Sequence, residues 1–169
     1  YQHHAVDIPA GALLGLFALW LFPRSGPSPL AEFQFTSDPK ARRIGFYYLA
    51  GAILFLVLAI QGLTITGYAV FWLWLATALA IVALGYFGAG AGIFQKQTDG
   101  SVSLASRWLL WPYRFFARLN IRFWTRKLPA HVELGDGVFL GRFPKAAELS
   151  SFAAVIDLAA EMVPPPHSI

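Results

Sequence analysis

The chain has 169 residues, of which 57% are hydrophobic, 16% aromatic and only 13% charged, with a formal net charge of +4. Soluble domains carry about 25% charged residues, so this composition argues against an ordinary soluble protein and excludes disorder for most of the chain. Cysteine is absent, which excludes disulfides, thiolate metal sites and cysteine nucleophiles within these residues.

An apolar segment that ends at Pro23 opens the chain. Counted from His3 it is about 21 residues long, which is enough for a helix to cross the roughly 30 Å core of a bilayer. Pro9 fits the first turn of that helix, where a missing backbone N–H costs little. Residues 1–23 are therefore predicted to form one membrane helix, followed by a polar, proline-rich loop over residues 24–43.

An uncharged stretch from Ile44 to Gln95 comes next, and its length predicts two more membrane helices. We expect them at about 44–63 and 68–94, joined by a tight turn, so that residues 44–94 form a transmembrane hairpin. Thr36-Ser37-Asp38-Pro39 predicts the start of its first helix, because capping side chains precede a proline in the first turn.

Eleven of the thirteen Lys and Arg residues lie in two blocks beside the apolar runs. One block is the 24–43 loop and the other follows the third apolar run, whereas the turn between the second and third runs carries no charge. The positive-inside rule places both blocks on the cytoplasmic side, which agrees with three spans. Residues 24–43 and 95–169 are then cytoplasmic, and the start of the chain, with His3, faces the opposite side of the membrane.

Residues 95–127 are predicted to form a basic amphipathic helix at the membrane surface. Five arginines fall within an arc of about 120° on a helix with about 100° per residue. Roughly opposite lie Leu109, Phe116, Leu119 and Phe123. We expect the arginines, with tryptophans that suit the headgroup layer, to contact anionic lipid headgroups. These residues are Arg107, Arg114, Arg118, Arg122, Arg126, Trp108, Trp111 and Trp124.

Two alternatives for this helix are a solvated face and a protein-docking surface, while nucleic acid is not an expected partner. Pro112 is expected to bend or break the helix near its first third, because a proline inside a helix removes one hydrogen bond. Membrane lipids are therefore the partner that the sequence favours.

Residues 128–169 have the pattern of a soluble domain. An Asp-Gly turn signal between short apolar runs predicts a hairpin over 132–141. A short helix is expected over 144–152, and Ala154–Leu158 predicts a buried strand. This is the opening of an α/β domain, and because about 40 residues cannot close a core, the chain is expected to be an excerpt of a longer polypeptide.

The expected fold is thus an α-helical integral membrane protein with about three transmembrane helices and a basic interfacial helix, followed by the short α/β beginning of a soluble domain. Its candidate catalytic residues are His3 and Asp7, with His4 beside them. On a helix His3 and Asp7 lie one turn apart, so the carboxylate can bind one ring nitrogen and raise the nucleophilicity of the other. This geometry suits phosphoryl transfer through a phosphohistidine. The alternative is a pair of interfacial histidines at the polar end of a membrane helix.

The residues around this pair, Tyr1-Gln-His-His-Ala-Val-Asp7-Ile-Pro-Ala-Gly-Ala-Leu-Leu-Gly15, resemble the third signature of the type 2 phosphatidic-acid phosphatase superfamily. That signature is Ser-Arg, five residues, His, three residues and Asp, usually followed by a glycine-containing membrane helix. The resemblance implies that His3 is the nucleophile and that Asp7 orients it, without a metal or another cofactor. It covers about 20 residues, and the Ser-Arg pair and the other two signatures are absent from them.

A second resemblance lies in residues 128–161. Val132-Glu-Leu-Gly-Asp-Gly-Val-Phe-Leu-Gly141 and Ala154-Val-Ile-Asp-Leu158 resemble the hairpin and the later strand that begin dual-specificity phosphatase domains. In that family a Cys-x5-Arg loop performs the chemistry, and because this chain has no cysteine we assign no catalytic residue here. Asp157 and Glu161 are expected to be structural.

Together, in this order, the two segments resemble bacterial membrane proteins that fuse both phosphatase types. They imply that the chain is the middle of such a fusion in the bacterial inner membrane, with His3 on the periplasmic side, acting on a lipid phosphate or a related phosphomonoester. The 169 residues alone are expected to be inactive.

The rival hypothesis is a non-catalytic accessory subunit that docks on a larger membrane complex through other transmembrane helices. Gly11-x3-Gly15 and Gly88-x3-Gly92 would then be helix-packing faces, because glycines let backbones approach closely. The alternative for both motifs is a flexible helix end.

Overall fold

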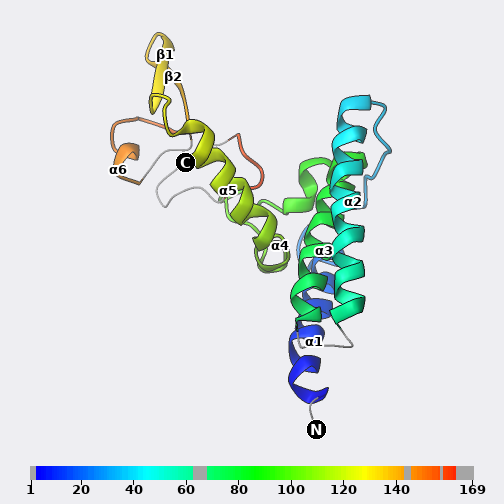
Figure 1. Cartoon of the computed structure of the whole chain (residues 1–169). Coiled ribbons are helices and arrows are strands. Elements are labelled where there is room, and N and C mark those ends of the chain that lie inside the picture. The colour runs from blue at the N-terminus through cyan, green and yellow to red at the C-terminus, as the bar shows by residue number, and fades with distance from the viewer. Residues whose placement is uncertain (1–2, 63–67, 143–145, 157, 163–169) are drawn as a thin grey trace.

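The computed structural model describes residues 3–62, 68–142, 146–156 and 158–162. The described α-helices are α1 (His3–Leu21), α2 (Pro39–Gly62), α3 (Ala69–Leu84), α4 (Leu104–Leu109), α5 (Trp111–Thr125) and α6 (Ala146–Leu149). A π turn, η1 (Gly85–Ala89), and a 3-10 turn, η2 (Gly90–Phe94), follow α3, and the strands β1 (His131–Gly135) and β2 (Val138–Gly141) follow α5. The described part of the chain is thus mostly helical, with a two-stranded antiparallel sheet near its C-terminal end (Figure 1).

The helices α2 and α3 pack side by side along their length (Figure 1). The Asp38 carboxylate accepts hydrogen bonds from the backbone N–H groups of Lys40 and Ala41, which satisfies two donors that a helix start leaves unpaired. The predicted start of this helix at Asp38 and Pro39 is therefore confirmed. Small buried residues such as Ala52 and Ala59 of α2 allow the two backbones to approach closely.

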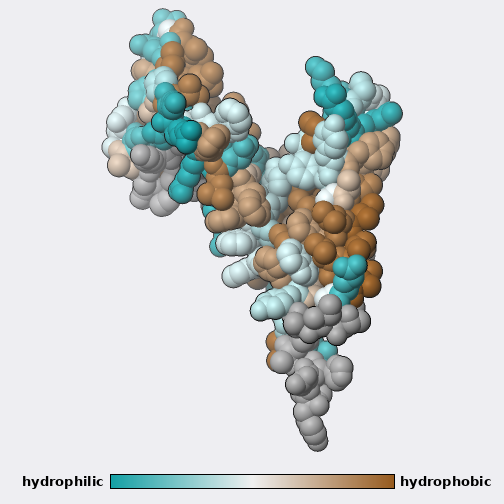
Figure 2. All heavy atoms as spheres, in the orientation of Figure 1, coloured by the Kyte–Doolittle hydropathy of each residue, from teal (hydrophilic) through white to brown (hydrophobic). Residues whose placement is uncertain are grey.

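Two helical stretches of the described residues, Pro39–Gly62 and Ala69–Phe94, are long and apolar enough to cross a membrane. The outer side of α2 exposes large apolar side chains, among them Leu54 and Ile60, and apolar surface follows the α2–α3 pair in Figure 2. Helix α1 contributes a shorter apolar stretch, Asp7–Leu21. The turn expected between the second and third spans lies outside the described residues.

The last part of the predicted third span is not regular helix. The helix α3 ends at Leu84, and at Gly88 the backbone adopts φ 157°, after which the chain continues through η2. A Cβ atom at Gly88 would lie 2.1 Å from the carbonyl oxygen of Gln34, so glycine alone lets the loop and the helix end meet there. The prediction that Gly88-x3-Gly92 forms a helix-packing face is therefore wrong, because this glycine motif breaks the helix.

The buried core lies where α1, α3, η2 and α4 meet. Trp20 is fully buried, and its indole Nε1–H donates a hydrogen bond of 2.8 Å to the carbonyl of Ile93. The amide Nε2 of Gln95 in turn donates to the carbonyl of Trp20 at 2.7 Å. Leu109, predicted on the apolar side of the interfacial helix, also faces this interior, so it packs on protein rather than on lipid.

Residues 103–127 form two helices instead of one. The side chain of Ser103 caps α4 by accepting the N–H of Ser106, and the break comes at Leu110, two residues before Pro112 in the first turn of α5. The predicted break near Pro112 is confirmed, because proline lacks the N–H that would continue α4 and restricts the residue before it.

The C-terminal hairpin has the predicted turn. Asp136 and Gly137 both have positive φ, at 50° and 75°, which matches the two-residue type I′ turn that an Asp-Gly pair favours. A 2.7 Å ion pair between Arg142 and Glu148 joins the end of the hairpin to α6. Helix α6 covers the central part of the predicted helix over 144–152, whose first two residues lie outside the described ones.

The predicted buried strand over Ala154–Leu158 is wrong. Residues 154–156 and 158 are not part of a strand, and Ile156 and Leu158 are 83% and 87% exposed. A strand is held by hydrogen bonds to a neighbour, and in the described part of the chain β1 and β2 pair only with each other. Asp157 lies outside the described residues.

Candidate functional site

The predicted catalytic pair lies on one helix. Helix α1 runs without a break from His3 to Leu21, so positions 3 and 7 share a face one turn apart. Asp7 is exposed, and the N-terminal end of α1 projects beyond the α2–α3 pair (Figure 1). The side chain of His3 is outside the described part, so the backbone brings the pair to one face and gives no distance between the two side chains.

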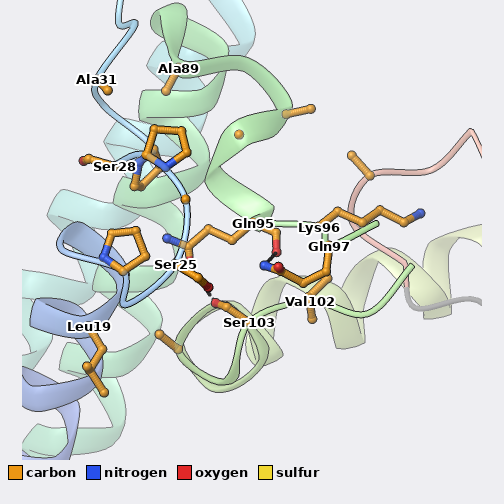
Figure 3. Close-up of a pocket in the computed structure, with 18 of the residues that line it drawn as sticks. Leu19, Ser25, Ser28, Ala31, Ala89, Gln95, Lys96, Gln97, Val102 and Ser103 are labelled. Atoms are coloured by element: carbon orange, nitrogen blue, oxygen red, sulfur yellow. Dashed lines mark hydrogen bonds between the residues drawn. The ribbon is translucent and has the colours of Figure 1, made fainter. Parts of the chain in front are cut away.

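A cleft with a volume of about 980 Å³ lies elsewhere, between the loop over 23–32 and the segment over 88–105. Leu19 lines it, twelve residues after Asp7 and so about 18 Å further along α1 at 1.5 Å per residue. Figure 3 shows Gln95 at its centre, hydrogen-bonded to Ser103 and to Gln97. These polar groups already bond to one another, so we assign this cleft no reaction.

The arginines of α4 and α5 form a second, smaller cleft of about 280 Å³. Its lining residues are Arg107, Trp111, Arg114, Phe115 and Arg118. Arg114 is only 5% exposed, and its Nε has no hydrogen-bond partner among the described residues. Burial, and then the positive charges of Arg118 and Arg107, lower the pKa of Arg114.

Two tryptophan contacts hold this cleft against α3. The indole Nε1–H of Trp74 donates to the carbonyl of Trp108 at 2.9 Å, an oxygen that Pro112 cannot satisfy because it has no N–H. The ring of Trp74 also stacks on Trp111, with centroids 5.7 Å apart. Since Trp74 is an inner residue of α3, the arginine cleft lies alongside the α2–α3 pair rather than beyond its end.

The eight predicted lipid-contact residues therefore have different surroundings. Seven of them are exposed, namely Arg107, Arg118, Arg122, Arg126, Trp108, Trp111 and Trp124. The eighth, Arg114, is buried. A sequence pattern with one helical period does not distinguish Arg114 from its neighbours, because burial depends on the fold around the helix.

Comparisons with protein-family models, curated proteins and solved structures find no match to this chain. The two phosphatase resemblances therefore rest on the residues that carry them. Within the described ranges, no group of three or more His, Asp and Glu side chains could hold a metal ion. The chemistry that can be assigned thus centres on the His3–Asp7 pair and on the arginine cleft.

Proposed function

We propose that this chain belongs to a membrane phosphatase that hydrolyses a lipid phosphate or a related phosphomonoester through a phosphohistidine. The observation that carries the proposal is the spacing of His3 and Asp7 on one unbroken apolar helix. Asp7 is exposed, on the end of α1 that projects beyond the α2–α3 pair (Figure 1), where a substrate can reach it. The resemblance to the lipid-phosphatase signature also supports the proposal.

In the proposed reaction a ring nitrogen of His3 attacks phosphorus while the ester P–O bond breaks. The alcohol leaves with a proton from an acid outside these residues, and Asp7 stabilises the charged imidazole through the other ring N–H. Water then cleaves the N–P bond, which releases inorganic phosphate and restores His3. The positive end of the α1 dipole favours an anionic substrate at this position.

The proposed membrane placement has three spans, formed by α1, α2 and the helical run Ala69–Phe94. Lys40, Arg42 and Arg43 lie in the first turns of α2, and that end of α2 is opposite to the end where the chain begins (Figure 1). Helix α5 and the hairpin extend toward the same end as these basic residues (Figure 1). The basic first turns of α2 support a cytoplasmic side for residues 24–43 and a periplasmic side for His3, in a bacterial inner membrane. We place residues 95–169 on the cytoplasmic side as well, with α4 and the start of α5 reaching back along α3 into the membrane layer.

The test compares two neighbouring histidines in the full-length polypeptide that carries this segment. We expect His3→Ala to lower phosphate release from micellar phosphatidic acid by about a thousandfold or more, because it removes the nucleophile. His4→Ala is the matched control, since position 4 points about 100° away around the helix, and should keep near wild-type activity. Wild-type activity in the His3→Ala variant would contradict the proposal.

The second candidate is a non-catalytic accessory subunit, and one observation favours it. A Cβ atom at Gly11 or Gly15 would meet no described atom within 4 Å, so this glycine face of α1 is open to another helix. Affinity purification from native membranes tests it. Stable recovery with a larger complex that Gly11→Leu disrupts, together with an inactive wild-type protein, would favour the subunit over the enzyme.

A further inference from the structure

We propose that Arg107, Arg114 and Arg118 form a binding site for a phosphate group, in the cleft that they share with Trp111 and Phe115. A phosphomonoester lipid headgroup and free phosphate both offer this chemistry. The site is separate from the His3–Asp7 pair, and it does not depend on the proposed phosphatase reaction.

The three arginines line one cleft. Arg114 and Arg118 are one turn apart on α5, and Arg107 of α4 lines the same cleft across the break at Leu110. The cleft volume of about 280 Å³ is several times the share of one water molecule in the liquid. It therefore has room for a tetrahedral anion between the three side chains.

The described residues do not balance the charge of this cleft. Within the described ranges no carboxylate forms an ion pair with any of the three arginines, and arginine stays protonated in proteins. A buried charge is costly unless it is paired and hydrogen-bonded. Arg114 is 95% buried, and its Nε has no hydrogen-bond partner among the described residues. An anion that accepts this N–H would therefore remove the free-energy cost of a buried, unpaired donor.

Two aromatic side chains line the cleft beside the arginines. Trp111 stacks on Phe115 with ring centroids 5.4 Å apart, and it also stacks on Trp74 of α3. Because Trp111 and Phe115 are themselves exposed, the cleft is open to a ligand from the surface. The contact with α3 also sets the cleft beside an apolar surface that a lipid tail can cover.

The experiment titrates two probes, short-chain phosphatidic acid and inorganic phosphate, into the full chain in neutral detergent and measures heat by calorimetry. We expect saturable binding of a phosphate-bearing probe and a loss of about tenfold or more in affinity for Arg114→Gln, as for a charged hydrogen-bond partner. Arg122→Gln, which removes an exposed arginine outside the cleft, is the matched control and should change affinity by less than about twofold.

Because Arg114 is buried, its substitution also affects folding. A second variant therefore tests the site without changing a buried residue. Arg107→Gln combined with Arg118→Gln changes two exposed side chains, and its fold is checked by thermal unfolding. Binding of phosphatidic acid alone supports a lipid headgroup as the ligand, and equal binding of both probes supports free phosphate. Absence of saturable binding by the wild type, or undiminished binding by the folded double variant, would overturn the site. Neither result depends on His3.

Discussion

The core around Trp20 is held by contacts between residues far apart in sequence, whereas the hairpin of β1 and β2 is held by contacts between residues close in sequence. Trp20 bonds through its indole to Ile93 and through its carbonyl to Gln95, which lie 73 and 75 residues away in sequence. Within the described part of the chain, the two strands pair only with each other, across the two-residue turn at Asp136 and Gly137. Every strand residue is exposed, whereas the Trp20 side chain is fully buried.

This difference shows what each region needs in order to form. Turn residues with positive φ specify the hairpin locally, and the ring contacts of His131 and Phe139 with Phe152 also join residues close in sequence. Val132 and Leu140 remain exposed. The Trp20 core instead needs α1, η2 and α4 to be in place at once. Substitutions in the core should therefore affect the whole helical part, and substitutions at the hairpin should have small, local effects.

The largest expected effect is at Gly88. Gly88→Ala puts a Cβ atom 2.1 Å from the Gln34 carbonyl oxygen on a backbone with φ 157°, so we expect a loss of stability of about 3 kcal/mol or more. Thermal unfolding in neutral detergent measures it. Gly92→Ala is the matched control, because its Cβ would lie 4.0 Å from the carbonyl oxygen of Pro29. Equal stability of the two variants would contradict the account of this break.

Trp20→Phe should have an intermediate effect. The change keeps an aromatic ring but leaves the buried Ile93 carbonyl without its indole donor, which should lower the free energy of unfolding by about 1–3 kcal/mol. Trp124→Phe is the control, because Trp124 is exposed and its indole donates to the exposed Asn120 side chain; it should lose less than about 0.5 kcal/mol. A larger loss for Trp124→Phe would reverse the proposed ranking of the two tryptophans.

The smallest effect is expected at the ion pair between Arg142 and Glu148. Both side chains are partly exposed, so a double-mutant cycle of Arg142→Gln and Glu148→Gln should give a coupling energy below about 1 kcal/mol. The coupling is measured from the unfolding of the four proteins. A coupling as large as the Trp20→Phe effect would contradict the expectation that this partly exposed, local ion pair contributes little.

Local signals in the sequence predict local features of this structure well. Asp38 before Pro39 marks the start of α2, Asp136-Gly137 marks the hairpin turn, and Pro112 marks the break between α4 and α5. Each depends on backbone chemistry within a few residues. The two apolar stretches that can cross a membrane follow in the same way from composition.

Features that depend on distant contacts are not predictable from one sequence. Gly88 resembles a packing glycine until the position of Gln34 is known, and Ala154–Leu158 has a strand pattern without a described neighbour to pair with. Arg114 has the same helical period as the exposed arginines, and only the folded structure shows that it is buried. For the candidate site, the sequence supplies the His3–Asp7 spacing, while the arginine cleft becomes visible only in the fold.

The most direct test of the central claim is to trap the covalent intermediate. The active full-length polypeptide is mixed with phosphatidic acid, quenched in alkali, in which phosphohistidine is stable, and its peptides are analysed by mass spectrometry. The account predicts phosphate on His3, still present in His4→Ala and absent in His3→Ala. An active enzyme with no phosphate on His3, or with phosphate on His4 instead, would contradict it.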